Sequence, residues 1–390
     1  MKKYIFVTLC FVISCASAQK NVLFIGNSYI YTNDLPAMIA DMASSTNDKI
    51  SYSSNTPGGC TFRQHCLNGS MDLIRQGGWD VVVLQEQSQF PSFPLWQVEE
   101  DVYPYAEMLV DSIYAYSDCP EPMFFMTWGR KNGDAVNAEI YPPLGTYDGM
   151  DSLLRERYIY MGNAFHASVC PAGKVWYYLR HNHKSIELYS KDESHPSVAG
   201  TYAAACVFYT MIFEKDPTLV SYNSSLDTAT ARVIREAART VVYDSLYVWK
   251  RKMPVAAFTY QNVGNATVSF RAQTDSVDNW EWYFGDGSSC YGETVIHTFP
   301  ANGTYEVMLT VTRHCLKDSV VVNVEINDSV STNDIYVTDD ETNEAENVRI
   351  VNAAGRVVYQ GRRMYAPFSS LPAGVYFVNR KKVVIGLRNR

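Results

Sequence analysis

The 390-residue sequence lacks the features that mark membrane-spanning, nucleic-acid-binding and zinc proteins. Beyond its first residues it has no unbroken apolar run near the roughly 18 residues that a membrane-spanning helix needs. Its formal net charge of -8 provides no overall positive field for nucleic acid. No CxxC pair or His/Cys cluster has the spacing of a zinc site. We therefore expect neither a nucleic-acid partner nor a metal, and no transmembrane segment in the mature chain.

The N-terminus predicts export. Lys2 and Lys3 precede a short apolar run, and Ala16-Ser17-Ala18 provides a small-x-small cleavage pattern, so residues 1–18 are interpreted as a signal peptide. A second interpretation stays open, in which Cys15 ends a lipoprotein box and is lipidated. Either way the protein would leave the cytoplasm, where disulfides can form.

Cysteine usage allows disulfides without specifying them. Two of the nine cysteines lie in the predicted signal, so an odd number remains and at least one has no partner within the chain. Cys290 and Cys315 are the only pair in their region, which makes them plausible partners. Cys60 and Cys66 are close enough to pair, but their spacing does not decide it.

Residues 19–252 alternate short apolar runs with helical patterns, which predicts an α/β domain with a mostly parallel sheet. The expected buried strands are Val22–Ile25, Asp80–Leu84 and Met123–Thr127. The expected helices are Leu35–Ala43, Val98–Tyr116, the nearly all-apolar Ser197–Phe213, and Leu226–Lys250.

The pattern changes after Pro254. Residues 254–326 alternate in polarity and are separated by turn residues, which predicts a small all-β sandwich. Residues 327–347 are polar and acidic and are expected to be a linker. Residues 348–390 form a last β-rich unit.

The first expected strand ends directly in Gly26-Asn27-Ser28, which a helical pattern follows. Such a serine lies at the carboxyl edge of the sheet, where open α/β sheets place their sites. Its backbone N–H could stabilise the oxyanion of acyl transfer. On its own the tripeptide is more often a plain turn.

A second motif, Asp192-Glu193-Ser194-His195-Pro196, places an acid three residues before a histidine in a polar loop. His195 would take the proton of Ser28 and return it to the leaving alcohol, while Asp192 would orient the imidazole. Each motif alone has an ordinary structural explanation. Their joint occurrence in one α/β domain predicts a Ser28–His195–Asp192 triad.

At these residues the sequence resembles the SGNH (GDSL) hydrolase superfamily over about residues 20–250. The first block is Phe24-Ile25-Gly26-Asn27-Ser28, and the last is Asp192-x-x-His195-Pro196 followed by Ser197-x-x-Gly200. The resemblance implies a flavodoxin-like three-layer α/β/α fold. It also implies an enzyme that cleaves esters of lipids or acetyl groups of carbohydrates through an acyl-enzyme, without a cofactor.

The middle blocks depart from the family pattern. The resemblance implies an oxyanion hole made by the N–H of Ser28, a glycine N–H and a side-chain amide. Pro57-Gly58-Gly59 supplies the glycine, with Gly59 preferred to Gly58. Where the family has Gly-x-Asn-Asp, this chain has Gln85-Glu86-Gln87-Ser88, so Gln85 or Gln87 would donate the amide.

Other residues near these blocks are candidates for contact with substrate, and each also suits a structural role. An arginine would bind an anion or a sugar hydroxyl, and a tryptophan could stack on a pyranose ring. The candidates are Asn27, Arg63, His65, Trp128 and Arg130.

The β-rich units resemble two modules of secreted bacterial proteins. Residues 254–326 resemble a PKD domain through Trp280–Gly287, His297-Thr298-Phe299 and Gly303-Thr304-Tyr305, with Trp282 and Phe284 facing the core. Residues 348–390 resemble a type IX secretion sorting domain through Val348–Val358, Leu371–Val378 and Lys381–Val384. The second resemblance implies export by the type IX machinery to the medium or cell surface, and favours simple signal cleavage over lipidation of Cys15.

Three functions are compatible with these motifs. The leading hypothesis is a secreted serine esterase that acts on acylated carbohydrates or other small esters. The irregular third block motivates a second, a surface adhesin or glycan-binding protein whose hydrolase domain is catalytically silent. A lipase-type esterase is the third, although no amphipathic lid is evident.

Overall fold

The computed structural model describes residues 19–274 and 276–327, and beyond them the backbone of strands at 331–333, 347–352, 357–362, 374–378 and 381–385. The chain divides into two compact units, residues 1–251 and 252–390. The predicted signal peptide, most of the linker at 327–347 and the side chains of the expected sorting domain at 348–390 lie outside the described residues. No helix in the described part of the chain has the length and apolarity to cross a bilayer.

The first unit is built on a five-stranded sheet of order β2-β1-β3-β4-β5. Every neighbouring pair is parallel. This is the flavodoxin-like order, so the predicted fold class is confirmed. The strands are β1 (Lys20–Ile25), β2 (Ile50–Asn55), β3 (Val81–Leu84), β4 (Glu121–Phe125) and β5 (Ser168–Cys170).

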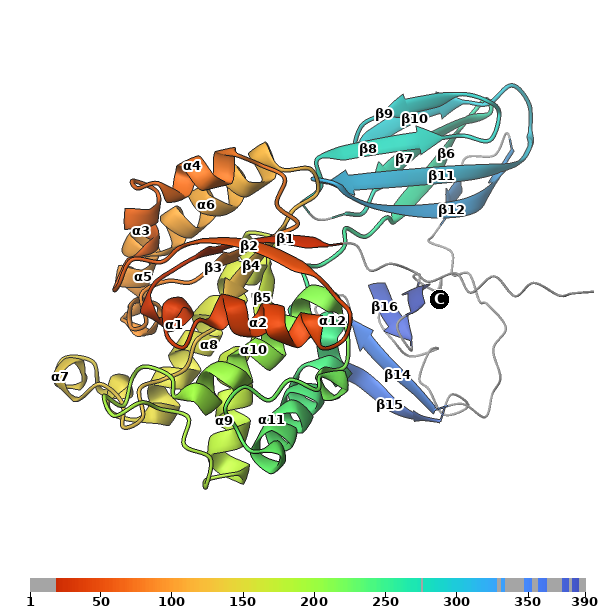
Figure 1. The fold of residues 1–390 in the computed structure, drawn as a ribbon. Helices are drawn as coiled ribbons and strands as arrows, with labels where there is room; N and C mark the ends of the chain where they lie inside the picture. The colour runs from red at the N-terminus through yellow and green to blue at the C-terminus, as the bar shows by residue number, and fades with distance from the viewer. Residues whose placement is uncertain are drawn as a thin grey trace, which may run out of the picture. The chain divides into compact units, whose positions relative to one another are not determined.

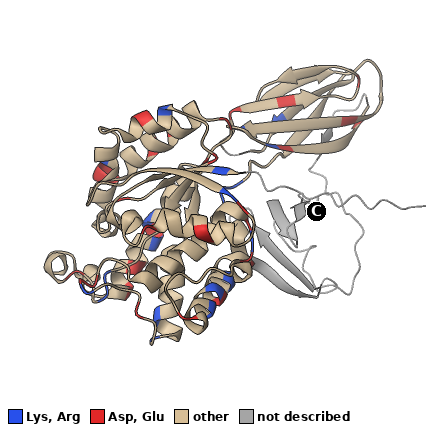
Figure 2. Cartoon of the chain, in the orientation of Figure 1, with Lys and Arg blue, Asp and Glu red and all other residues tan. Residues whose placement is uncertain are grey.

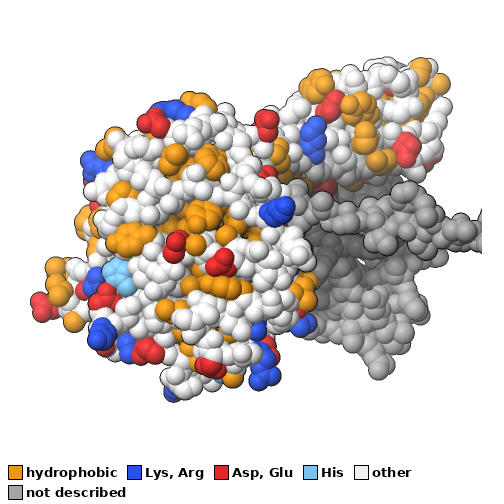
Figure 3. Space-filling view, in the orientation of Figure 1, with side chains coloured by type: hydrophobic (Ala, Val, Ile, Leu, Met, Phe, Trp, Pro, Cys, Tyr) orange, Lys and Arg blue, Asp and Glu red, His pale blue; other side chains and the backbone are white. Residues whose placement is uncertain are grey.

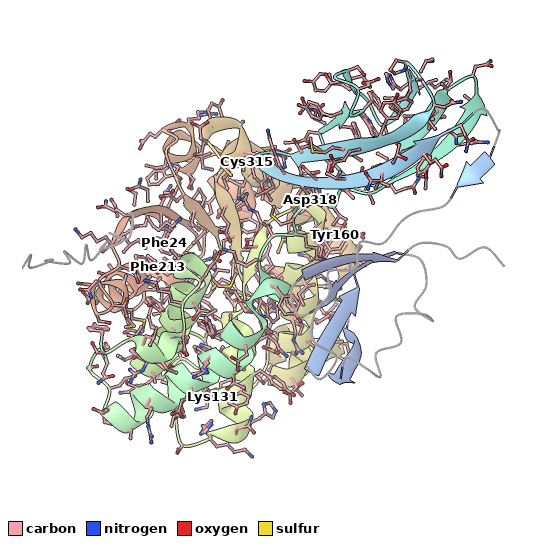
Figure 4. All side chains as sticks on the ribbon, turned by 90° about the vertical axis from the view of Figure 1, so that its right-hand side faces the viewer. Phe24, Lys131, Tyr160, Phe213, Cys315 and Asp318 are labelled. Carbon is pink, nitrogen blue, oxygen red and sulfur yellow. The ribbon has the colours of Figure 1, made fainter. Side chains whose placement is uncertain are left out.

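Helices cover both faces of this sheet, with α4 and α6 on one face and α2 and α10 on the other (Figure 1). Side chains fill the space between the layers, as the surroundings of Phe24 show (Figure 4). The helices are α1 (Ser28–Tyr31), α2 (Leu35–Ser44), α3 (Phe62–His65), α4 (Ser70–Arg75), α5 (Leu95–Asp101), α6 (Tyr103–Tyr116), α7 (Ala135–Ala138), α8 (Tyr147–Ala164), α9 (Ala172–Asn182), α10 (Val198–Phe213), α11 (Thr228–Val241) and α12 (Leu246–Trp249), with 3-10 turns at Phe90–Ser92, Pro142–Gly145, Pro217–Leu219 and Tyr243–Ser245.

Two expected helices are each broken in the structure. The segment Val98–Tyr116 divides between α5 and α6 because Pro104, near the start of α6, cannot donate a helical N–H bond and its ring clashes with the preceding turn. The segment Leu226–Lys250 divides into α11, a 3-10 turn and α12. The break follows Thr240-Val241-Val242, whose β-branched side chains are stiff in a helix.

Strand register brings the polar segments of the unit to one edge. Ile25 pairs with Leu84, and Leu84 pairs with Phe124. Because the strands are parallel, the segments that follow them lie at the same carboxyl edge. These segments are 26–28, 85–88 and 126–130.

The second unit begins with two antiparallel four-stranded sheets, of order β10-β7-β6-β13 and β12-β11-β8-β9. Trp282 and Phe284 are buried in the core between them, and Gly285 and Gly287 have φ angles of 76° and 92°, as expected for their turn. The strands are β6 (Phe258–Gly264), β7 (Thr267–Ala272), β8 (Asn279–Tyr283), β9 (Ser289–Tyr291), β10 (Thr294–Thr298), β11 (Gly303–Arg313), β12 (Leu316–Ile326) and β13 (Ser331–Asn333), and a third sheet contains β14 (Asn347–Asn352), β15 (Val357–Arg362), β16 (Gly374–Val378) and β17 (Lys381–Ile385).

The expected Cys290–Cys315 disulfide is wrong. Cys290 is a free thiol. On β9 it pairs with Trp282 of β8, which in turn pairs with Leu309 of β11, and Cys315 lies six residues beyond Leu309 along the chain. At about 3.3 Å per residue that separation is far beyond disulfide reach. Cys60 and Cys66, whose pairing the sequence left open, are free thiols as well.

Candidate active site

The expected nucleophile lies in a tight turn between β1 and α1. A Cβ atom on Gly26 would come within 2.6 Å of Ile30 Cδ1 and 2.7 Å of Gln85 Oε1, so this position accepts only glycine without rearrangement. Ser28 is the first residue of α1, and Asn27 caps that helix by accepting a hydrogen bond from the N–H of Tyr29.

Three side chains meet at this turn although they are far apart in sequence. Ser28 Oγ lies 2.8 Å from His195 Nε2, and His195 Nδ1 lies 2.5 Å from Asp192 Oδ2. A hydroxyl, an imidazole and a carboxylate in this order form the arrangement of an activated nucleophile, its base and the group that orients the base. The structure therefore brings together all three residues of the predicted triad.

The loop that carries His195 is held by Asp192. Its Oδ1 accepts hydrogen bonds from the N–H groups of Ser194, at 3.1 Å, and His195, at 3.0 Å. Partial burial tends to raise the pKa of Asp192, but the hydrogen bonds from the His195 ring and the two N–H groups outweigh it and hold the pKa below its ordinary value. Asp192 is thus a carboxylate across the neutral pH range.

An aromatic stack packs against the loop that carries His195. Trp128 is fully buried between Tyr29, whose ring centroid is 5.0 Å away, and Trp176, at 3.7 Å. Trp128 Nε1 donates to the carbonyl of Ser194, and Tyr29 Oη lies 2.8 Å from Ser194 Oγ. The expectation that Trp128 stacks on a sugar is therefore wrong, because both of its faces are covered by protein rings.

The glycine loop lies against α1. Asn27 Nδ2 donates to the carbonyls of Cys60, at 3.0 Å, and Glu86, at 3.4 Å, and Gly58 packs beside Tyr31 Oη. Gly59 is exposed and has a φ of 68°, a conformation that favours glycine. Since Asn27 is buried and its amide holds this loop, it is not placed to bind substrate as expected.

The two glutamines expected in the oxyanion hole differ in what they contact. Gln85 is buried; its Oε1 accepts from the N–H of Asn27, and its Nε2 donates to the carbonyl of Glu86. Gln87 Oε1 accepts from the N–H groups of Gln89 and Phe90, which leaves its Nε2 with one long contact of 3.4 Å to Gln89 Oε1. The Gln85 amide is therefore bonded to backbone at both ends within the core, whereas the Gln87 amide is fixed by its oxygen and has a donor to offer.

Glu86, for which the sequence predicts no role, connects the segment that follows the glycine loop to the segment that follows β3. Its side chain is fully buried, with Oε2 accepting from the N–H of Phe62 at 2.9 Å and Oε1 from the N–H of Gln87 at 2.5 Å. Burial raises the pKa of Glu86 to about 8, although these two N–H bonds oppose the shift. Its place between two glutamines gave no sequence signal, because charged residues in such a segment are ordinarily exposed.

The other three candidates for substrate contact lie in different environments. His65 is fully buried, with Nδ1 2.8 Å from Ser70 Oγ and Nε2 2.9 Å from the carbonyl of Gly26, so the expected substrate contact is wrong. Burial lowers its pKa to about 4, which keeps the ring neutral. Arg130 pairs with Asp134 at 3.6 Å and is one-third exposed, and Arg63 is exposed over the ring of Tyr105.

Comparison with known proteins finds a family-model match within the second unit. Residues 252–326 match the family model of the PKD domain, which confirms that prediction. Solved structures similar to the first unit include a DUF4886 family protein from Bacteroides uniformis (16% identity, 60% of this chain and 98% of that chain, TM-score 0.49). A Slackia heliotrinireducens protein assigned to the SGNH hydrolases is also similar (23% identity, 49% and 98%, TM-score 0.40).

The PKD unit also has similar solved structures, among them the PKD1 domain from Vibrio cholerae metalloprotease PrtV (23% identity, 20% of this chain and 99% of that chain, TM-score 0.18). A search of curated protein sequences gives no match to this chain. An assignment of function therefore depends on the geometry of the site.

Proposed function

We propose that the first unit is a serine ester hydrolase of the SGNH type that removes acetyl or similar acyl groups from carbohydrates. The observation that carries the proposal is the continuous hydrogen-bonded series from Ser28 Oγ through His195 to Asp192. A catalytically silent domain would have no need of this series, which favours an enzyme over an adhesin.

The residues present account for each proton transfer. His195 Nε2 accepts the proton of Ser28 as Oγ attacks the carbonyl carbon, and then protonates the departing alcohol. Asp192 stabilises the imidazolium that forms between these steps. Water, deprotonated by the same imidazole, then releases the acid from the acyl-enzyme.

The oxyanion would be stabilised by the N–H groups of Ser28 and Gly59 and by Gln87 Nε2. Among the described residues, none accepts a hydrogen bond from the N–H of Ser28 or Gly59. Tight packing of Asn27 and Glu86 against the two loops keeps these donors in place before substrate binds.

The two β-rich units support the proposal that this enzyme works outside the cell. PKD domains act mainly as spacers or adhesion modules on exported proteins, and the resemblance of residues 348–390 implies passage through the type IX machinery to the medium or cell surface. With acylated carbohydrate as the proposed substrate, the expected partners are that substrate and the secretion machinery.

Substitution of the nucleophile tests the proposal. Ser28→Ala should abolish hydrolysis of p-nitrophenyl acetate and labelling by a fluorophosphonate, because no other group at the turn can form the acyl-enzyme. Ser112→Ala, on α6, is the matched control and should retain both. Circular dichroism should show both variants folded. Wild-type turnover by Ser28→Ala would contradict the proposal.

A further inference from the structure

A surface hollow lies next to the segments proposed to form the oxyanion hole. It encloses about 420 Å³, within the range of small-molecule sites, and is lined by Thr61, Arg63, Gln64, Leu67, Phe90 and Asp101. One wall starts at Thr61, two residues after Gly59. The other includes Phe90, whose N–H donates to Gln87 Oε1. The lining residues are therefore close in sequence to two of the three proposed oxyanion donors, Gly59 and Gln87.

The charges in the hollow select for one kind of ligand. Arg63 and Asp101 both line it, yet neither has a hydrogen-bonded or ion-paired partner among the described residues. Arginine only donates hydrogen bonds and aspartate only accepts them. An anion would be repelled by Asp101 and a cation by Arg63, whereas neutral hydroxyl groups can satisfy both.

An acyl chain suits this hollow poorly. Covering two unpaired charges with a hydrocarbon would remove their water without replacing its hydrogen bonds, which is costly. Phe90 adds a ring on which the apolar face of a pyranose can rest. Figure 3 shows no broad apolar face on the side drawn, where apolar side chains are interspersed with polar ones.

We infer that this hollow is the subsite for the sugar that carries the acyl group, with Arg63 and Asp101 binding its hydroxyls and Phe90 supporting its ring. The inference rests on the proposed esterase function. Arg63 would then contact substrate, whereas its neighbour His65 is buried and does not.

The test compares two esters in the full mature chain. For each variant, kcat/KM is measured on acetylated xylotriose and on p-nitrophenyl acetate, which has no sugar. Arg63→Ala and Asp101→Ala should each lower the ratio of the two values by about tenfold, the loss of a hydrogen bond to a charged group. Arg75→Ala, an exposed arginine on α4, is the matched control and should leave the ratio unchanged.

An unchanged ratio in both hollow variants would overturn the inference. So would a wild-type enzyme that prefers p-nitrophenyl octanoate to the acetate by tenfold, because that preference requires an acyl-chain site.

Failure of the esterase proposal is distinguishable from failure of the subsite. A wild-type chain inactive on all three esters would overturn the function alone. Binding of unacetylated xylotriose to the Ser28→Ala chain, measured by calorimetry, then decides the subsite. A loss of binding on adding Arg63→Ala supports it, and unaltered binding overturns it.

Discussion

At the scale of single residues, the two glutamines at the end of β3 show how much a role depends on the direction of one amide. Both can donate a hydrogen bond, and they are separated by one residue. Gln85 is bonded at both ends to backbone, whereas backbone N–H groups hold only the oxygen of Gln87. Gln85 therefore fixes the turn, whereas Gln87 keeps an N–H for the oxyanion role proposed above.

This difference predicts different defects for the two alanine variants. Gln87→Ala should lower kcat on p-nitrophenyl acetate by about 10²-fold, the usual effect of removing one oxyanion donor. Its melting temperature should fall less than that of Gln85→Ala, because the N–H groups of Gln89 and Phe90 that lose their acceptor are only half-buried and water can replace it. Gln85→Ala should lower the melting temperature, because the N–H of Asn27 loses its buried acceptor. A normal kcat in folded Gln87→Ala would show that its amide does not contact the oxyanion.

Glu86 makes stability depend on pH. Burial raises its pKa from 4.5 to about 8, so the folded protein keeps a proton that the unfolded chain releases near pH 4.5. The stabilisation linked to this proton is therefore complete below about pH 4.5 and is lost as the pH rises toward 8.

Glu86→Gln should remove this contribution to the pH dependence, since an amide does not titrate. Its stability at pH 5 should lie close to that of wild type, because the amide, like the protonated acid present at that pH, has one strong acceptor oxygen. Urea midpoints at pH 5 and pH 8.5 measure both effects, with the exposed Asp72→Asn as the control. Equal slopes for Glu86→Gln and wild type would contradict the assigned pKa.

At the scale of elements, α10 positions the histidine loop. Trp176 Nε1 donates to the carbonyl of Gly200 in the first turn of α10, and the N–H of Ser197 donates to the carbonyl of Leu188. A Cβ atom on Gly200 would lie 2.2 Å from that same carbonyl oxygen and 2.5 Å from the Trp176 ring. Close approach of helix, loop and indole thus depends on a glycine.

Gly200→Ala should therefore displace the start of α10 together with the loop that carries His195. We expect a loss of about 1–3 kcal/mol in unfolding free energy, the usual cost of overpacking, and a fall in kcat on p-nitrophenyl acetate. Gly69→Ala, where an added Cβ meets nothing within 4 Å, should change neither. Thermal melts and steady-state kinetics on both variants provide the comparison, and a Gly200→Ala variant that behaves like Gly69→Ala would disprove this packing role.

The elements themselves were only partly predictable. The buried strands β1, β3 and β4 appear as apolar runs, and α10 as a helix apolar on every side, because a buried element needs no polar face. The edge strand β2, Ile50-Ser-Tyr-Ser-Ser-Asn, has a polar composition that does not predict a buried strand. Its conformation is decided by hydrogen bonding to β1.

At the scale of the whole molecule, the chain contains two cores that belong to different units. The first packs around the parallel sheet, and the second packs around Trp282, Phe270 and Phe284. Acidic and basic positions are interspersed along the ribbon of the first unit in the view drawn (Figure 2). No residue of the second core takes part in the proposed chemistry.

Separate cores predict separate unfolding. Trp282→Ala should destabilise the PKD unit by about 3–5 kcal/mol, the typical cost of removing a large buried side chain. Differential scanning calorimetry should show one transition lowered and the other unmoved, with hydrolysis of p-nitrophenyl acetate unaffected at 25 °C. The exposed Tyr291→Ala is the control. A single transition that moves as a whole would show that the units unfold as one.

The sequence by itself determined the strand-turn-helix at Ser28, the Asp192-x-x-His195 loop, the parallel α/β class and the β-sandwich after Pro254, because each depends on local spacing or on an apolar pattern. Only the tertiary structure decided which neighbouring side chains reach the site. Residues distant in sequence cover Trp128, His65 and Asn27. Gln85 and Gln87 differ in the backbone groups to which their side-chain amides bond. The direction and burial of a side chain depend on long-range packing, which no short motif records.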